Sequence, residues 1–420
     1  MARSYLPSVL AFLAAFLAHS LYTYGPEVHR TLTVAGVLRR NPASTAGLEE
    51  VIVIPDTIHC EDIHYYSPAN VLFTACEDKL ETRFGWFPGL GNLDNPELGR
   101  RGRGSIHVID VDTKKSQRLS FENFDTTFVT HGIDVVPDPS DPSAVYVFAI
   151  NHLPHPTIPR RAHSQIEVFH HVLGTPSARH IRSLWHPLVR TPNDLLGTAP
   201  DTLYVTNDHR NPDGFKRTIE DLYRGAKWTD TVRLQFSLHP TDDVSADVTA
   251  SVALDRMHNN NGIGHGPAPD DVLITSCTGG VLHIGRLLTN GSIALSESVE
   301  FDSIVDNPTY FADPYAQSSG VDHSGYLLPG LARAIEIGHT RTDPSATNSV
   351  VVWFARLRTE GGRRRWEKRA IFEDDGSRIR SASGAVLVAI DPATTGGVRK
   401  AWLFVTGFQS EAMVAVKVDL

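Results

Sequence analysis

Small acidic and amide residues recur in pairs beside the apolar, strand-like runs of this sequence. The pairs are Glu61-Asp62, Asn193-Asp194, Asn207-Asp208, Asn261 within the run NNNG (259–262), and Asp306-Asn307. Asp and Asn favour turns, so each pair taken alone is expected simply to lie in a turn. If the pairs converged, their carboxylates and carboxamides would form an all-oxygen shell. Such a shell suits calcium, whereas zinc prefers His or Cys and magnesium keeps more water.

Two histidines stand at the ends of consecutive predicted strands. His131 lies in FVTHGID (128–134), and His152 lies in FAINHLPH (148–155). Adjacent antiparallel strands can bring such ends together, and one imidazole can then polarise the other so that the pair acts as a general base. The alternative is that both are surface or capping histidines, as expected for most of the 20 in the chain.

Short runs rich in Val, Ile, Phe and Tyr follow one another from about residue 50 to the C-terminus. Examples are 51–55, 70–76, 105–111, 144–150, 165–172, 202–207, 231–238, 271–277, 349–357, 385–391, 402–408 and 412–420. Turn-forming clusters such as DPSDPS (138–143) separate them. Only two short helices are expected in this region, over 213–223 and 331–338, and the segment at about 315–348 is expected to be a long insertion loop.

Many short strands at even spacing indicate a sandwich, a barrel or a propeller. About 370 residues are too many for the single core of a sandwich or barrel, whereas six four-stranded blades of roughly 60 residues accommodate them. Glu61, Asn193, Asn261 and Asp306 are spaced at about two, one and just under one such blade length. In a propeller, equivalent ends of inner strands meet at the central channel, so this spacing favours a ring of ligands there, although no sequence repeat is visible.

Composition sets limits on the class of protein. Of the 420 residues, 41% are hydrophobic and 21% are charged, which is ordinary for a globular protein and excludes a disordered chain, a coiled coil or a polytopic membrane protein. The formal net charge of −9 makes nucleic acid an unexpected partner. The three cysteines permit one internal disulfide with one thiol left over, and they are too far apart for a CxxC zinc site.

The N-terminal segment is typical of a targeting signal. Arg3 precedes an apolar run over 5–21, whose core at 9–18 has the length of a signal-peptide h-region and is followed by a passable cleavage site at 18–20. An uncleaved membrane anchor and a buried N-terminal helix are the alternatives. We therefore expect a chain that is secreted or anchored on the extracellular or lumenal side, and Asn290 in Asn-Gly-Ser (290–292) is a glycosylation acceptor.

The segments that carry these residues resemble, in order, the motifs of the serum paraoxonase/arylesterase family. They are CEDIHYYSPANVLFTAC (60–76), FVTHGID (128–134), AINH (149–152), TPNDLLGTAPDTLYVTNDH (191–209), NNNGI (259–263), SIVDNP (303–308) and LFVTGFQSEAMVAVKVDL (403–420). The resemblance implies an all-β fold, a six-bladed β-propeller with four-stranded blades around a central calcium-binding channel. Residues 1–22 would be the signal peptide or anchor, and 23–420 a single propeller domain.

The resemblance also implies roles for individual residues around two calcium ions. The catalytic ion would be held by Glu61, Asn193, Asn261, Asp306 and Asn307. A structural ion would be held by Asp62, Asp194 and the backbone carbonyl of Ile133. His131 would deprotonate a water with the help of His152 while calcium polarised the carbonyl of a small ester or lactone. No covalent nucleophile is needed, and the chain has no G-x-S-x-G motif.

The chain departs from the family in its cysteines and in one loop region. Animal members of the family close the ring with a disulfide between the two ends of the chain, but the last strands here contain no cysteine. Cys60 and Cys76 instead flank the first hairpin-like segment, so we predict a bridge between them and a free Cys277. The residues after Asn307 and the segment at 315–348 also differ, which is expected to reshape the mouth of the pocket.

Three functions are compatible with these features. The leading hypothesis is a calcium-dependent hydrolase of lactones and aryl esters. The others are a pathway-specific cyclase or isomerase with a purely structural calcium, and a secreted propeller that only binds. Convergence of the five ligands and both histidines on one channel would favour the hydrolase, whereas scattered ligands would favour the binding protein.

Overall fold

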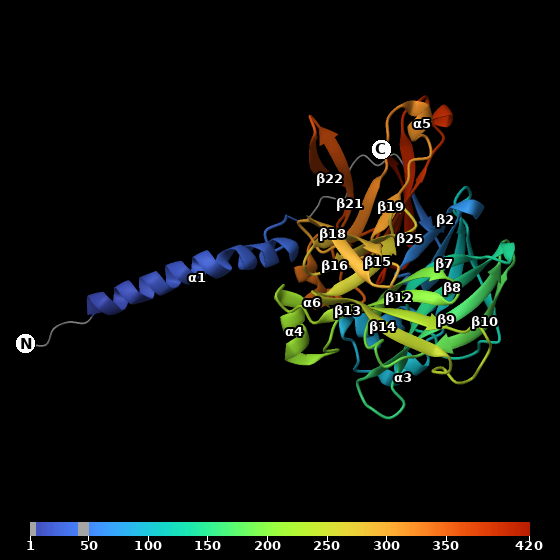
Figure 1. Cartoon of the computed structure of the whole chain (residues 1–420), viewed down its shortest axis with the longest axis horizontal. Helices are drawn as coiled ribbons and strands as arrows, with labels where there is room; N and C mark the ends of the chain where they lie inside the picture. Colours follow the sequence, from blue (N-terminus) through green and yellow to red (C-terminus); the bar gives the residue numbers. More distant parts are fainter. Residues whose placement is uncertain (1–5, 41–49) are drawn as a thin grey trace, which may run out of the picture.

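The structure is a computed structural model that describes residues 6–40 and 50–420. Short antiparallel sheets form six blades (Figure 1). Blade 1 contains β2 (Ile63–Tyr66), β3 (Val71–Cys76), β4 (Ser105–Asp110) and β5 (Ser116–Arg118). Blade 2 contains β7 (Thr130–Asp138), β8 (Asp141–Pro154), β9 (Ala162–Val172) and β10 (Ser177–Leu184), with β6 (Ser120–Glu122) added parallel to β10.

The remaining blades follow in chain order. Blade 3 contains β11 (Pro192–Ala199), β12 (Thr202–Asn207), β13 (Thr229–Phe236) and β14 (Val248–Met257). Blade 4 contains β15 (Asn260–His265), β16 (Asp271–Ser276), β17 (Val281–Leu287) and β18 (Ile293–Glu300). Blade 5 contains β19 (Thr309–Phe311), β20 (Gly325–Leu331), β21 (Val350–Glu360) and β22 (Arg363–Asp374). Blade 6 contains β23 (Ala382–Ala389), β24 (Lys400–Gly407), β25 (Met413–Asp419) and β1 (Val51–Ile54).

The ring closes through hydrogen bonds between the first and last strands. β1 pairs antiparallel with β25, with Val51 opposite Val416 and Ile54 opposite Met413. This pairing makes the first strand of the β-region the outer strand of the blade formed by the last three strands. The all-β, six-bladed propeller predicted from the sequence is therefore confirmed.

Apolar side chains between neighbouring blades hold the ring together. Phe73 of blade 1 and Phe169 of blade 2 belong to one buried cluster, and five further clusters lie at the other blade interfaces. Strands inside the blades, such as β3 and β24, carry buried apolar residues on both faces because they pack against a neighbouring blade on either side. The inner strands β2, β7, β11, β15, β19 and β23 contact one another in ring order, which places their ends around the central channel.

The structure differs from the expectation of a long insertion loop at about 315–348. This segment contains β20 (Gly325–Leu331), which lies between β19 and β21 in blade 5. Its sequence, GYLLPGL, contains residues that weaken strand propensity and so hid the strand. Gly330 is needed there because a Cβ atom would lie 2.1 Å from the Ile304 carbonyl oxygen.

The helices are short apart from the first. They are α1 (Leu6–Val34), α2 (Leu80–Gly85), α3 (Pro96–Arg100), α4 (Gly214–Leu222), α5 (Ala316–Ser319) and α6 (Ile337–Thr340). Single 3₁₀ turns lie at η1 (Ser67–Ala69), η2 (Pro88–Leu90), η3 (Ala334–Glu336) and η4 (Pro392–Thr395). The helix expected over 213–223 is α4, whereas the one expected over 331–338 is reduced to η3 and α6.

Helix α1 extends away from the propeller and is attached by its C-terminal end (Figure 1). Arg30 Nη2 donates to the carbonyl oxygens of Gly279, Gly280 and Phe301 at 2.7–3.0 Å. The helix continues past residue 22, the expected end of the leader, and residues 1–5 of that leader lie outside the described residues. Among the described helices, none combines the length and apolar character needed to cross a membrane.

Candidate active site

The channel contains two cavities separated by a layer of acidic and amide side chains. The first cavity has a volume of about 700 Å³, and the second has a volume of about 560 Å³. In three of the predicted pairs, Glu61-Asp62, Asn193-Asp194 and Asp306-Asn307, the two residues face different cavities. The first cavity is lined by Glu61, Asn193, Asn261 and Asp306, and the second by Asp62, Asp194 and Asn307. The structure thus brings together residues that are far apart in the sequence.

Five buried oxygens of this layer have no hydrogen-bond partner within the described parts of the chain. They are Glu61 Oε2 and the Oδ1 atoms of Asn193, Asn261, Asp306 and Asn307. An unpaired buried polar group costs about 1–3 kcal/mol, so five in one layer fit a site that binds a cation. The donor set is entirely oxygen and includes neutral amides, which fits calcium. The ligand role of these residues stays a prediction.

The carboxylates of this layer repel one another. Burial, followed by the neighbouring Asp306 and Asp62, raises the pKa of Glu61 well above its usual value. Burial likewise raises the pKa of Asp306, again with a contribution from Asp62. Asn307 Nδ2 donates to Glu61 Oε1 at 3.0 Å, which leaves Glu61 Oε2 and Asn307 Oδ1 available to a cation. A divalent ion would stabilise the ionised form of both acids.

Asp62 and Asp194 hold the blades together through backbone amides. Asp62 Oδ2 accepts from the Ile133 amide at 3.3 Å, and Asp194 Oδ2 accepts from the Ile263 amide at 2.8 Å. Burial raises the pKa of Asp62 to about 6 and that of Asp194 well above its usual value. The structure therefore places Ile133 beside Asp62, and its carbonyl as a ligand of a second ion stays a prediction. Gly132 permits the close approach of Asp194, since a Cβ there would lie 2.5 Å from Asp194 Oδ1.

The two predicted catalytic histidines are in contact. His131 at the start of β7 and His152 near the end of β8 are brought together by the pairing of these strands. His131 Nδ1 lies 2.8 Å from His152 Nε2, and His152 Nδ1 lies 2.8 Å from Ser164 Oγ. His131 lines the first cavity, and its Nε2 lies 3.9 Å from Glu61 Oε1. The ring of Phe87 packs edge-on against His131, with centroids 4.8 Å apart.

Burial lowers the pKa of both rings and so favours their neutral forms. It lowers the pKa of His131 well below the usual value, with further contributions from His152 and Arg83. It lowers the pKa of His152 to about 3. In the arrangement with both protons on Nδ1, His131 donates to His152 and His152 donates to Ser164. The lone pair of His131 Nε2 is then free to accept a proton at the cavity wall.

A protein-family model described as Arylesterase matches residues 85–317, which is more than half of the chain. The chain belongs to the arylesterase family. It is 27% identical over 228 residues to serum paraoxonase/arylesterase 2 of Gallus gallus, covering 53% of this chain and 56% of that relative. It is 25% identical over 226 residues to serum paraoxonase/arylesterase 1 of Mus musculus, with the same coverage. The chain thus spans about half the length of the curated relatives it matches.

Solved structures of other proteins are also similar to this chain. A luciferin-regenerating enzyme aligns with 9% identity and a TM-score of 0.43, covering 88% of this chain and 95% of that chain. A periplasmic gluconolactonase from Pseudomonas aeruginosa aligns with 10% identity and a TM-score of 0.41, covering 86% of this chain and 85% of that chain.

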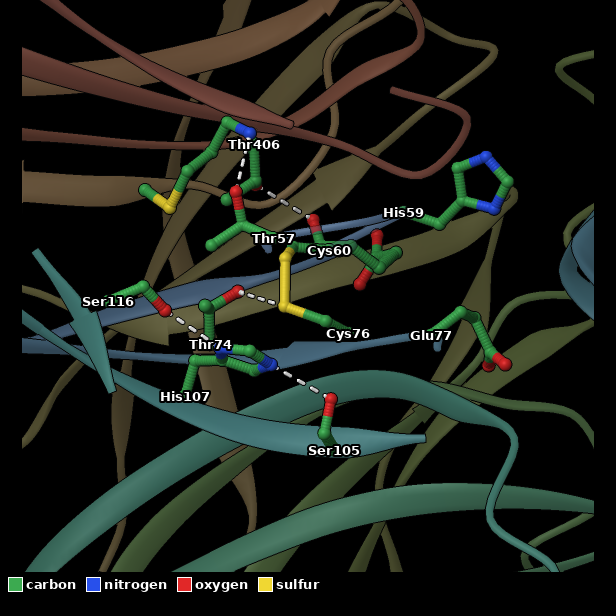
Figure 2. The surroundings of a disulfide bond; sticks show 12 residues. Thr57, His59, Cys60, Thr74, Cys76, Glu77, Ser105, His107, Ser116 and Thr406 are labelled. Atoms are coloured by element: carbon green, nitrogen blue, oxygen red, sulfur yellow. Dashed lines mark hydrogen bonds between the residues drawn. A yellow bond between two sulfur atoms is a disulfide. The ribbon is translucent and has the colours of Figure 1, made fainter. Parts of the chain in front are cut away.

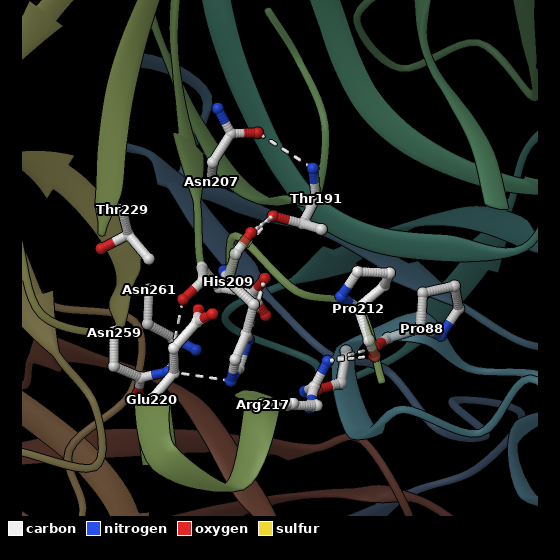
Figure 3. A network of polar contacts seen from close by, with 12 residues as sticks. Pro88, Thr191, Asn207, His209, Pro212, Arg217, Glu220, Thr229, Asn259 and Asn261 are labelled. Atoms are coloured by element: carbon white, nitrogen blue, oxygen red, sulfur yellow. Dashed lines mark hydrogen bonds and ion pairs between the residues drawn. The ribbon is translucent and has the colours of Figure 1, made fainter. Parts of the chain in front are cut away.

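A network of polar side chains lies beside the layer of acidic and amide residues (Figure 3). The sequence of this arylesterase-family chain did not predict it. His209 lies between Asp208 and Asp221, at 3.1 and 2.8 Å. Burial and Arg217 act to lower the pKa of His209, but the two carboxylates raise it overall. Arg217 of α4 donates to the carbonyl oxygens of Pro88 at 3.3 Å and Pro212 at 3.0 Å, which fastens the helix beside the cavity. The segment TNDH (206–209) contains Asp208 and His209, but it does not indicate that Asp221 of α4 contacts His209.

The mouth of the first cavity is formed partly by the N-terminal segment. Thr31, Leu32, Val34, Ala35 and Val37 line it together with residues of the propeller. Cys277, buried and outside any disulfide, also lines this cavity. Neither contribution was predicted, because the sequence of a terminal helix does not indicate where its end docks.

The disulfide predicted between Cys60 and Cys76 is present, with Cα atoms 3.9 Å apart (Figure 2). Cys60 immediately precedes Glu61, and Cys76 ends β3. The Glu61 amide donates to the Ala75 carbonyl at 3.2 Å, and Thr406 Oγ1 donates to the Glu61 carbonyl at 3.1 Å. The bridge therefore helps to fix the backbone of a predicted calcium ligand.

Proposed function

We propose that this protein is a calcium-dependent hydrolase of small aryl esters and lactones. One observation carries the proposal: five unpaired buried oxygens and the His131–His152 pair meet at one channel. Membership of the arylesterase family adds support, since curated relatives carry the paraoxonase/arylesterase name. The calcium ligands would be Glu61, Asn193, Asn261, Asp306 and Asn307.

The residues of the first cavity would divide the reaction between them. Bound calcium would polarise the substrate carbonyl and stabilise the negative charge that develops on its oxygen. His131 Nε2 would accept a proton from the attacking water, and His152 would hold the ring of His131 in the required orientation. Phe87, Phe408 and Leu331 would pack against the apolar part of the ester.

The proposal is tested by assaying the full chain on phenyl acetate and on a series of γ- and δ-lactones. We expect hydrolysis that disappears after prolonged incubation with a calcium chelator and returns when calcium is added. Hydrolysis that continues after calcium removal has been verified by elemental analysis would refute calcium dependence. Absence of hydrolysis of every ester and lactone in the calcium-loaded protein would refute the hydrolase function.

We also propose that the chain passes through an oxidising compartment and is secreted or anchored on the extracellular or lumenal side. The Cys60–Cys76 disulfide supports this, because disulfides are rare in reducing compartments. Asn290 is exposed beyond the end of β17, where an attached glycan could be accommodated. An enzymatic deglycosylation shift that is lost in Asn290→Gln would support the proposal, and a reduced Cys60–Cys76 pair in protein from native cells would contradict it.

A further inference from the structure

The second cavity contains a cluster of two histidines and a carboxylate that the proposed reaction does not use. His64 Nδ1 lies 2.6 Å from Asp134 Oδ1, and His265 Nε2 lies 2.9 Å from Asp134 Oδ2. One potential ligand atom from each of the three side chains lies within 4.8 Å of the other two. All three residues line the cavity of about 560 Å³.

The propeller brings these side chains together from three blades. His64 lies on β2 of blade 1, Asp134 on β7 of blade 2, and His265 on β15 of blade 4. The Gly197 amide of β11 donates to Asp134 Oδ2 at 2.7 Å and so fixes the carboxylate from a fourth direction, blade 3. The side chain of Asp134 is 4% exposed, whereas those of His64 and His265 are 20% and 44% exposed. The carboxylate is thus held rigidly while the imidazoles can adjust.

We propose that His64, Asp134 and His265 form a binding site for a divalent transition-metal ion of the zinc class. Two imidazoles with one carboxylate suit zinc and neighbouring metals, whereas calcium selects oxygen ligands. Zinc bonds of about 2.0–2.2 Å in tetrahedral geometry place ligand atoms about 3.3 Å apart. The separations here, from 2.6 Å to at most 4.8 Å, bracket that value, so binding needs only small side-chain movements.

This site is distinct from the layer of acidic and amide side chains described above, which we call the oxygen layer. The carboxylates of Asp62 and Asp194 accept hydrogen bonds from backbone amides and offer no nitrogen ligand to a metal. Three protein ligands leave at least one coordination position that faces the second cavity. A bound metal would cross-link blades 1, 2 and 4 at this end of the channel and would therefore stabilise the folded ring.

Simple His–carboxylate pairs elsewhere in the chain provide a matched control. His170 Nε2 lies 2.9 Å from Asp138 Oδ2, the same distance as in the His265–Asp134 pair. Among the residues that the structure describes, no second histidine completes a three-residue group around Asp138. His170→Ala therefore removes an equivalent hydrogen bond without removing a candidate metal ligand.

The test uses the full chain in excess calcium, freed of transition metals and then titrated with Zn²⁺ or with Co²⁺. We expect one equivalent of Zn²⁺ bound per chain, a Co²⁺ absorption spectrum typical of nitrogen ligation, and a higher Tm with Zn²⁺. His265→Ala and His64→Ala should each weaken Zn²⁺ binding at least about tenfold and abolish the Tm increase. His170→Ala should bind as the wild type does.

The excess calcium keeps Zn²⁺ out of the oxygen layer, so the readout reports on the histidine cluster. His265→Gln is a second variant at an exposed position, so it is expected to fold. The test therefore remains decisive if His64→Ala fails to fold. Absence of saturable Zn²⁺ binding to the wild type would overturn the proposal. Unchanged binding in folded His265→Ala or His265→Gln would also overturn it, because the metal would then lie elsewhere.

Discussion

His131 Nδ1 lies 2.8 Å from His152 Nε2, and only His131 of the two reaches the first cavity. The contact continues from His152 Nδ1 to Ser164 Oγ, so three polar side chains lead from the cavity wall into blade 2. This order separates two roles. In the proposed reaction, His131 would exchange a proton with a bound water, and His152 would be a positioning residue that acts through His131.

The order predicts unequal effects of two substitutions on hydrolysis. His131→Gln should lower kcat by about 10²–10⁴, the usual contribution of a general base. His152→Gln should lower kcat less, because His131 Nε2 keeps its lone pair and only the contact that orients the His131 ring is lost. Stopped assays on phenyl acetate, together with calcium analysis, measure both effects. His163→Gln, next to Ser164 but packed on Trp185, is the control, and wild-type kcat in His131→Gln would contradict the assignment.

The unpaired oxygens predict which carboxylates would hold the proposed calcium ion. Glu61→Gln and Asp306→Asn should each weaken calcium binding by about tenfold or more, since each removes one negative charge from an all-oxygen site. Competition with a coloured chelator measures the dissociation constant. Asp208→Asn removes a charge from the same cavity, but Asp208 is paired with His209, so calcium affinity should change little. An equal loss in all three variants would indicate a general charge effect instead.

Asp194 is predicted to contribute to stability more than to turnover. Its two oxygens accept from the amides of Leu195 and Ile263, and the second bond joins blade 3 to blade 4. Asp194→Asn leaves one oxygen, so at least one buried amide loses its acceptor, at about 1–3 kcal/mol of unfolding free energy. Urea unfolding in saturating calcium measures the loss. Asp141→Asn, an exposed carboxylate on Ser143, should unfold like the wild type.

The sequence predicted the ring and the convergence of its acidic and amide residues because the signals for both are local. Acidic and amide residues interrupt strand-forming runs, and Glu61-Asp62, Asn193-Asp194 and Asp306-Asn307 each lie at the start of an inner strand. The Cys60–Cys76 bridge was predictable for the same reason, since both residues flank one hairpin.

What could not be predicted depends on contacts between distant segments. β20 was hidden because its glycines and proline are tolerated only against particular neighbours, such as the Ile304 carbonyl beside Gly330. His64, Asp134 and His265 carry no shared local motif, and only closure of the ring brings their three blades together. The docking of α1 at the cavity mouth likewise depends on carbonyl groups of blade 4 that receive Arg30.

The disulfide is predicted to stabilise the chain locally. Cys60 and Cys76 are separated by 16 residues, and closing a loop of about that size stabilises a protein by roughly 3 kcal/mol. The double variant Cys60→Ser/Cys76→Ser should therefore lose about that amount of unfolding free energy, and its calcium affinity should fall because Glu61 follows Cys60 directly. Cys277→Ser, which removes a thiol but no bridge, is the control. A double variant as stable as the wild type would show that the bridge is dispensable.

His107 predicts how stability depends on pH. Its ring is buried between Ser105 Oγ at 2.9 Å and Ser116 Oγ at 2.7 Å (Figure 2), and burial lowers its pKa to about 4. Unfolding restores a pKa of about 6.5, so between these values the unfolded chain binds more protons and stability falls as the pH falls. The full effect is on the order of 3 kcal/mol between pH 6.5 and pH 4.

Comparing variants isolates this contribution of His107, because the other titratable groups are the same in all of them. Urea unfolding of the wild type and of His107→Gln should show a steeper loss of stability for the wild type between pH 6.5 and pH 4, since glutamine takes up no proton. His239→Gln, which changes an exposed histidine, should follow the wild type. Parallel pH profiles for the wild type and His107→Gln would mean that His107 gains no proton on unfolding in this range, and that the acid sensitivity of the propeller arises from other groups.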